Sequence, residues 1–222
     1  MLPHPYYPPD LQIDNYVPNS LPTMVLLAWV IATVVTWLTT MYIISGTAVH
    51  MKPGKDRLIF CWFSICALTH CFFEVYWVCF SKTVASRKDF LAELWREYAH
   101  SDSRYMVSDP LVLTLEIMTV TIIGPLCVLA MIALYRNSPS RHLYQLIISV
   151  FHIFSCSLYY ILDSFKGFSS CDPNPIYFWV YFVGFNSPWI IVPALLIYDS
   201  CVSIYKATSR YRVRWERPIK DK

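Results

Sequence analysis

The stretch from residue 68 to residue 78, LTHCFFEVYWV, places two ionisable side chains inside an apolar and aromatic run. His70 and Glu74 are four residues apart, so they share one face if the run is helical. A charged side chain at the middle of a bilayer costs about 2.5 to 3.5 kcal/mol, so such residues usually face a bundle interior. An imidazole one turn from a carboxyl group predicts acid–base chemistry at this position.

Other polar side chains lie in later apolar runs. Glu116 and Thr119 share a helix face, and so do Asn186 and Trp189. In antiparallel spans Glu116 has about the depth of Glu74, so one interior pocket can collect all these side chains. A buried carboxyl group that keeps its proton can donate it, and a second carboxylate or an imidazole can accept one. An indole face attracts a cation by about 2 kcal/mol or more when desolvated. This set suits proton transfers that move a carbon double bond.

A structural alternative applies to the same residues. Glu74 and Glu116 can serve as hydrogen-bonding contacts between helices, with His70 as a satisfied core histidine. The fourth apolar run also carries His152 and, near its end, Asp163.

The composition is typical of a membrane protein. Of the 222 residues, 56% are hydrophobic, 17% aromatic and only 15% charged, which is too apolar for an ordinary soluble domain. Five apolar runs are long enough to cross a bilayer, at 22–44, 58–80, 111–135, 143–165 and 176–198. We therefore predict an all-α membrane protein, a five-transmembrane-helix bundle that encloses an intramembrane pocket.

Three parts of the chain follow from this pattern. They are an N-terminal interfacial segment at 1–21, a five-helix membrane domain at 22–199 and a basic C-terminal tail at 200–222. The Pro-rich opening lacks Lys and Arg, so we expect no cleavable signal peptide. Lys and Arg number 12 on the side of the tail and six on the other. The positive-inside rule predicts a cytosolic C-terminus and an N-terminus on the lumenal side.

Several function classes lack support in the sequence. The eight cysteines form no CxxC pair, so we expect neither a disulfide framework nor a metal site. Among five glycines there is no phosphate-binding loop or dinucleotide fingerprint, and no cofactor is expected. The basic tail follows a membrane span, so we expect it to face anionic lipid headgroups in the bilayer rather than nucleic acid.

Five blocks carry a family resemblance: HPYYPPDLQIDNYVPN, CWFSICALTHCFFEVYWV, LAELWREYAHSDSRY, LEIMTVTIIGPL and YFWVYFVGFNSPWIIVP. Together they resemble the emopamil-binding protein family of sterol isomerases, within the EXPERA superfamily. The resemblance implies a five-helix protein of the endoplasmic reticulum membrane that needs no cofactor. It also implies a membrane sterol as substrate and binding of cationic amphiphilic drugs. A homodimer and other sterol-biosynthesis enzymes are further candidate partners.

The same resemblance implies a reaction, a sterol Δ8 to Δ7 isomerisation. A proton reaches C9, a cation forms at C8 and a proton leaves C7. The family's functional residues fall on His70, Glu74, Glu116, Thr119, Asn186 and Trp189. The glutamates would carry the protons, with the histidine setting their protonation. The tryptophan would face the cation, and the asparagine and threonine would orient the acids.

The sequence departs from the family pattern at two places. Val75 stands where members commonly have Gly, and residues 152–155 replace a common Gln and Tyr-Gly pair. Both changes bear on cavity shape and substrate preference. The loop block LAELWREYAHSDSRY is interpreted either as a solvated amphipathic segment or as an interfacial cap over the pocket.

Two other function classes stay open. A non-catalytic sterol or cationic-amphiphile binding protein also needs an apolar pocket with acids, but only an isomerase needs a donor and an acceptor together. A small proton-coupled transporter is disfavoured because no inverted repeat or pair of broken helices is evident.

Overall fold

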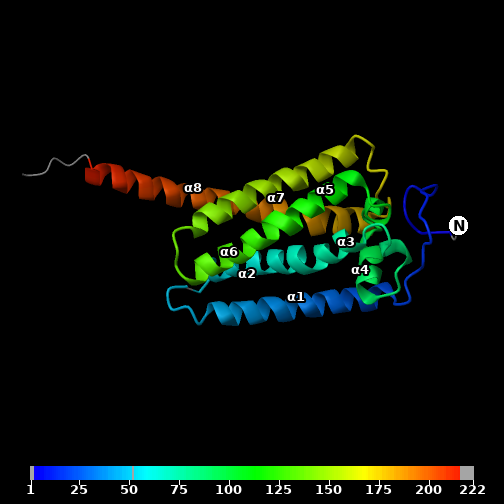
Figure 1. The fold of residues 1–222 in the computed structure, drawn as a ribbon, viewed down its shortest axis with the longest axis horizontal. Helices are drawn as coiled ribbons and strands as arrows, with labels where there is room; N and C mark the ends of the chain where they lie inside the picture. Colours follow the sequence, from blue (N-terminus) through cyan, green and yellow to red (C-terminus); the bar gives the residue numbers. More distant parts are fainter. Residues whose placement is uncertain (1–2, 52, 216–222) are drawn as a thin grey trace, which may run out of the picture.

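Five helical segments of the computed structural model are long and apolar enough to cross a membrane (Figure 1). The structure describes residues 3–51 and 53–215, and all regular secondary structure in these ranges is helical. The five segments are Thr23–Ser45, Lys55–Phe80, Pro110–Tyr135, Arg141–Ser164 and Ile176–Tyr211. The predicted all-α membrane fold with five spans is therefore confirmed. Lys52 and residues 216–222 of the predicted tail lie outside the described residues.

The first span is one continuous helix, α1 (Thr23–Ser45), which begins after Pro22. It packs along α2 (Lys55–Leu68) and touches the loop helix α4 (Phe90–Tyr98). The indole Nε1 of Trp37 donates to the backbone carbonyl oxygen of Ser64 at 3.1 Å, which fixes α1 against α2. Few other side chains of α1 are buried, so most of its surface is left for lipid.

The second and third spans each contain a π-helical segment. The second span consists of α2, η1 (Thr69–Phe73) and α3 (Glu74–Phe80). The third consists of α5 (Pro110–Met118), η4 (Thr119–Ile123) and α6 (Gly124–Tyr135). Short π-helical insertions are rare and frequently mark functional sites. Here η1 and η4 contact each other, so the two irregular segments meet inside the bundle.

Gly124 permits this close approach. A Cβ atom built at Gly124 would lie 2.7 Å from the Sγ atom of Cys71 and 3.2 Å from the Cβ atom of His70. A side chain at this position would therefore push the start of α6 away from η1. The glycine brings the third span against the residues of the second span that carry the predicted chemistry.

The fourth and fifth spans form the most extensive helix pair. The fourth is α7 (Arg141–Ser164), and the fifth joins η5 (Ile176–Gly184) to α8 (Pro188–Trp215). The buried Gln145 of α7 donates from Nε2 to the backbone carbonyl oxygen of Leu196, 3.0 Å away. The sequence analysis ends the membrane domain at residue 199. In the structure α8 continues as one helix beyond that residue to Trp215. It projects past the end of the bundle opposite to the N-terminus (Figure 1).

A folded cap closes the other end of the bundle. Its elements are η2 (Val84–Ser86), α4 and η3 (Ser103–Met106), and the N-terminal segment lies beside them (Figure 1). Asn19 joins the segment to α4, since its Nδ2 donates to the carbonyl oxygen of Glu93 at 3.0 Å and its Oδ1 accepts from Arg96 Nε at 2.7 Å. Burial opposes ionisation of Glu93, yet hydrogen bonds from Ser20 and Leu21 lower its pKa below the ordinary value.

The burial of α4 decides between the two interpretations of the loop block. Most of its side chains are buried, including Trp95 and the charged Glu93, Arg96 and Glu97. A solvated amphipathic segment would leave these charges in water. The loop block is thus a packed cap rather than a solvated segment.

Two hydrophobic cores share the bundle. The core at the cap end is rich in aromatic side chains, with Trp77, Trp95 and Tyr105 among its buried members. The core at the other end is mainly aliphatic and includes Ile123 and Leu134. The π-helical segments contribute to both cores, with Phe182 of η5 in the first and Ile123 of η4 in the second.

Candidate active site

His70 and Glu74 form the first contact of the site. His70 lies in η1, Glu74 is the first residue of α3, and the His70 Nδ1 atom is 2.7 Å from the Glu74 Oε2 atom. The exposed fractions of the two side chains are 3% and 14%. A hydrogen bond to an ionised group inside an apolar bundle is stronger than one in water. The i,i+4 spacing thus produces a buried imidazole–carboxyl pair.

Thr119 connects this pair to the third span. Its hydroxyl group donates to the Glu74 Oε2 atom at 2.7 Å and also lies 2.9 Å from the backbone carbonyl oxygen of Glu116. The same Glu74 oxygen therefore receives hydrogen bonds from two spans. This oxygen thus joins the second and third spans.

Glu116 has a different set of contacts. Its Oε1 atom accepts a hydrogen bond from the Tyr105 hydroxyl group at 2.7 Å, and its buried Oε2 atom has no partner among the described residues. Thr119 links the two acids, since its hydroxyl group contacts the Glu74 carboxyl group and the backbone carbonyl oxygen of Glu116. Burial raises the pKa of Tyr105, which lies in the cap, so its phenol keeps the proton that it donates.

Among the described residues, Asn186 and Trp189 make no hydrogen bond or ring contact with the acids and reach the cluster only through other aromatic side chains. Asn186 donates from Nδ2 to the Tyr98 hydroxyl oxygen at 3.1 Å, and the Tyr98 ring packs edge-on against Tyr105 with centroids 5.4 Å apart. Trp189 packs against Trp62 with ring centroids 5.6 Å apart. The structure thus brings together four of the six predicted residues directly and links Asn186 to Glu116 through two cap tyrosines.

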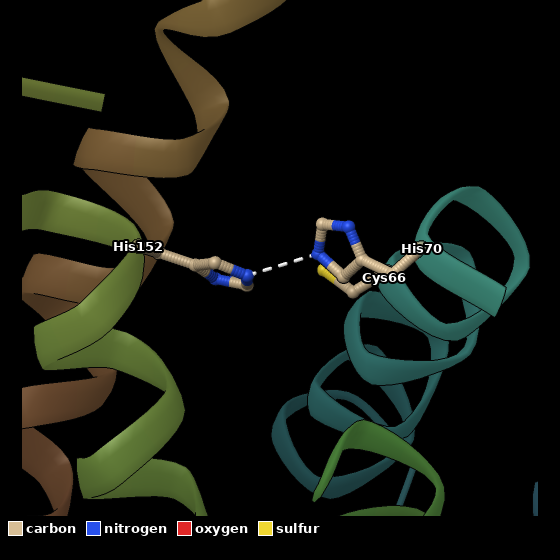
Figure 2. Close-up of side chains that lie close together, drawn as sticks. All are labelled: Cys66, His70 and His152. Carbon is tan, nitrogen blue, oxygen red and sulfur yellow. Dashed lines mark hydrogen bonds between the residues drawn. The ribbon is translucent and has the colours of Figure 1, made fainter. Parts of the chain in front are cut away.

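His152 belongs to the same cluster, although the sequence analysis did not assign it to the site. Its Nε2 atom is 3.0 Å from the His70 Nε2 atom, and it is 1% exposed (Figure 2). Trp62 packs edge-on against it, with centroids 6.5 Å apart. The sequence offered one signal for His152, since it is an ionisable residue inside a span. The sequence could not show that His152 on α7 faces η1, because this depends on packing between distant spans.

The cap tyrosines were also missed as site residues. Tyr98 and Tyr105 lie outside the predicted spans, in the loop block. A buried ion pair fixes η3, since Arg104 Nη2 is 2.7 Å from Asp102 Oδ2. The Arg104 guanidinium also lies over the Tyr159 ring of α7, 4.6 Å from its centroid. These contacts hold Tyr105 in the cap, where its hydroxyl group reaches Glu116.

The six predicted residues do not line a surface hollow at the end of α3 and α5. Its lining comes from residues 78–83 together with Leu113 and Ile117. The predicted intramembrane pocket stays a prediction. Its support is the polar cluster around Glu74 and Glu116.

The chain is similar to a known family of membrane enzymes. Residues 90–200 match EBP, described as EXPERA (EXPanded EBP superfamily). The chain is 37% identical to the 3-beta-hydroxysteroid-Delta(8),Delta(7)-isomerase of Cavia porcellus, over 92% of this chain and 90% of that protein. Identity to the protein of the same name is 35% in Rattus norvegicus, covering 94% and 92%. It is 34% in Mus musculus, covering 93% and 90%.

Proposed function

Because this chain belongs to the EXPERA superfamily, we propose that it is an isomerase that moves the Δ8 double bond of a membrane sterol to Δ7. Similarity to sterol isomerases over most of the chain supports the reaction class. The observation that carries the proposal is the buried cluster in which two carboxyl groups lie together with different hydrogen-bond partners. A donor and an acceptor on neighbouring spans are what a proton-in, proton-out reaction needs.

Glu116 is the proton donor in this proposal. Its Oε2 atom is buried without a partner, and its Oε1 atom receives one hydrogen bond, from Tyr105. A carboxyl group in apolar surroundings with few donors favours its neutral form. It would deliver its proton to C9 of the Δ8 sterol, which leaves a tertiary cation at C8.

Glu74 is the proton acceptor. His70 and Thr119 both donate to its Oε2 atom, which favours the carboxylate before the reaction. It would remove the proton from C7, and the electrons of that C–H bond would form the Δ7 double bond. One proton enters and one leaves, so no cofactor is required. Transfer from Glu74 to the neighbouring Glu116 would restore the starting state.

Trp189 and Asn186 would act on the cation and on the acids. Trp62 packs edge-on against His152, and Trp189 packs against Trp62. An indole face stabilises a nearby cation by about 2 kcal/mol when desolvated. Asn186 holds Tyr98, which packs against Tyr105, the partner of Glu116. Asn186 would therefore orient the donor indirectly, while Thr119 orients the acceptor directly.

The cellular setting follows from the same proposal. We place the protein in the endoplasmic reticulum membrane, with a lumenal N-terminus and a cytosolic C-terminus. The excess of Lys and Arg on the side of the tail supports this orientation. Residues 1–21 form an interfacial segment, 22–199 the membrane domain and 200–222 a basic tail. A cationic amphiphilic drug would occupy the place of the cation, and a homodimer or contacts with other sterol-biosynthesis enzymes would form in the same membrane.

The direct test is conversion by the purified protein. Protein in nanodiscs is incubated with a Δ8 sterol and no added cofactor, and the products are separated by gas chromatography with mass spectrometry. We expect the Δ7 isomer to accumulate, and expression in an isomerase-deficient yeast strain to restore Δ7 sterols. If the protein binds the sterol and never moves the double bond, it is a sterol-binding member of the superfamily.

A further inference from the structure

A thiol and two imidazoles lie together next to the candidate acids. Cys66, His70 and His152 each offer one ligand atom, and these atoms all lie within 4.8 Å of one another (Figure 2). Their exposed fractions are 0%, 3% and 1%. Cys66 and His70 are one helical turn apart on the second span, and His152 reaches them from α7. The sequence did not predict a metal site because the third ligand is 82 positions away from the second.

The geometry of the two imidazoles is close to that of a zinc site. The Nε2 atoms of His70 and His152 are 3.0 Å apart. Two nitrogens bound to tetrahedral zinc at 2.0 to 2.1 Å are about 3.3 Å from each other, and a nitrogen and a sulfur are about 3.6 Å apart. The imidazoles need to separate by a few tenths of an ångström, and the thiol, which lies within 4.8 Å of both nitrogens, needs to approach them by up to about 1 Å.

Glu74 supplies the outer partner that such a site needs. The Nδ1 atom of His70 faces the Glu74 carboxyl group at 2.7 Å, so its Nε2 atom is the one that points toward His152. Histidines that bind a metal commonly donate their second N–H group to a carboxylate, which fixes the ring and strengthens the ligand. This carboxyl–imidazole arrangement is present beside Cys66.

The charges balance if zinc binds. A Zn²⁺ ion carries two positive charges, and the Cys66 thiolate and the Glu74 carboxylate supply two negative ones. An uncompensated charge in an apolar interior is costly, so a neutral group is the form that the bundle can hold. A thiolate with two imidazoles is a ligand set that zinc accepts, with a fourth position left open.

We propose that Cys66, His70 and His152 form a binding site for one Zn²⁺ ion inside the bundle. The thiol releases its proton on binding, and both imidazoles bind in their neutral forms. The ion binds the His70 Nε2 atom. Its positive charge then lies across the imidazole ring from Glu74, which contacts Nδ1. Zinc would therefore fix the His70 ring that contacts Glu74 and inhibit the proposed isomerase reversibly. Binding itself does not depend on that activity.

The test measures metal binding by the purified full chain in nanodiscs. Metal-free protein is titrated with Zn²⁺ by equilibrium dialysis with elemental analysis, and in parallel with Co²⁺ by absorption spectroscopy. We expect one tightly bound Zn²⁺ per chain, removable by a chelator, and a thiolate-to-cobalt charge-transfer band.

Two serine variants locate the site. Loss of an outer-shell partner costs about 10- to 100-fold in metal affinity, so loss of the thiolate ligand in Cys66→Ser should cost more than about 100-fold. Cys61→Ser is the matched control, because Cys61 is a buried thiol of the same helix whose partner is the carbonyl oxygen of Leu38. This variant should bind Zn²⁺ like the wild type.

Three results would overturn the site. They are no stoichiometric Zn²⁺ binding, a Co²⁺ spectrum without a thiolate band, and unchanged affinity in folded Cys66→Ser. The cobalt spectrum of the wild type decides the matter even if that variant does not fold. Inhibition of isomerisation by Zn²⁺ in the wild type and not in Cys66→Ser is a separate readout, so failure of the proposed activity leaves the binding result interpretable.

Discussion

The surroundings of Glu74 and Glu116 differ although both are buried glutamates on neighbouring spans. Glu74 is held within the membrane by His70 and Thr119, which both contact one of its oxygens. Glu116 is held from the cap by Tyr105 alone, and its second oxygen has no partner among the described residues. Chemically identical groups are separated into acid and base when their environments differ in this way. In the proposed mechanism the cap therefore takes part in the chemistry, since Tyr105 contacts the proposed donor, Glu116.

The largest expected effect is loss of either acid. Glu74→Gln and Glu116→Gln keep the shape of the side chain and remove the group that exchanges a proton. Loss of a general acid or base costs about 100- to 10,000-fold in turnover, so both variants should be nearly inactive while they remain folded and inserted. Sterol isomerisation and a folding assay in the same nanodiscs check this. Near-normal turnover in one variant would make that glutamate a structural contact between helices.

Thr119→Val tests the Glu74 side of the comparison. It removes a donor to a carboxylate, and a hydrogen bond to a charged group contributes about 1.5 to 3 kcal/mol, which corresponds to about 10- to 150-fold. We expect this loss in kcat with little change in KM. Thr121→Val is the matched control, since the exposed Thr121 hydroxyl group donates to its own helix at Ile117. Equal rates for Thr119→Val and the control would remove Thr119 from the mechanism.

Several features of this site were accessible from the sequence, and the reasons are physical. Apolar run length located the five spans, and helical spacing placed His70 with Glu74 and Glu116 with Thr119. The antiparallel order of two spans then gave these four residues similar depths. The facing of His152 was not accessible because it depends on how α7 packs against η1.

The π-helical segments limit such reasoning further. A π-helical turn holds more residues than an α-helical turn, so it shifts the facing of all residues beyond it. Glu74 and Thr119 stand at the borders of η1 and η4, where this shift occurs. Tyr105 could not be assigned from span periodicity because it lies in the cap, whose packing depends on contacts distant in sequence.

Trp189→Leu tests whether the indole recognises a cation or only fills space. Leucine keeps the surroundings apolar and removes the π face. A cationic amphiphile should lose about 1 to 2 kcal/mol of affinity, which is about 5- to 30-fold, while a neutral Δ8 sterol binds nearly as before. Binding of both ligands and the isomerisation rate are measured together. Equal losses for the two ligands would show that Trp189 only packs.

Tyr105→Phe should have the smallest effect and sharpens the contrast between the acids. It removes the Tyr105 hydroxyl donor to Glu116, and a hydrogen bond between neutral groups contributes about 0.5 to 1.5 kcal/mol, or about 2- to 13-fold. Since a neutral donor acid needs this contact less than the Glu74 carboxylate needs Thr119, the loss in kcat should be smaller than in Thr119→Val. The reverse order would exchange the roles of donor and acceptor.

In the proposed mechanism an acidic group of this protein adds a proton to the sterol at C9 while another group removes one from C7. It is tested most directly by a single turnover in heavy water, with protein in excess over the Δ8 sterol and exchanged with the solvent beforehand. The product is analysed by NMR and mass spectrometry. The account predicts a Δ7 sterol with one deuterium at C9, made by the wild type and not by Glu116→Gln. A Δ7 product that carries hydrogen at C9 would contradict it.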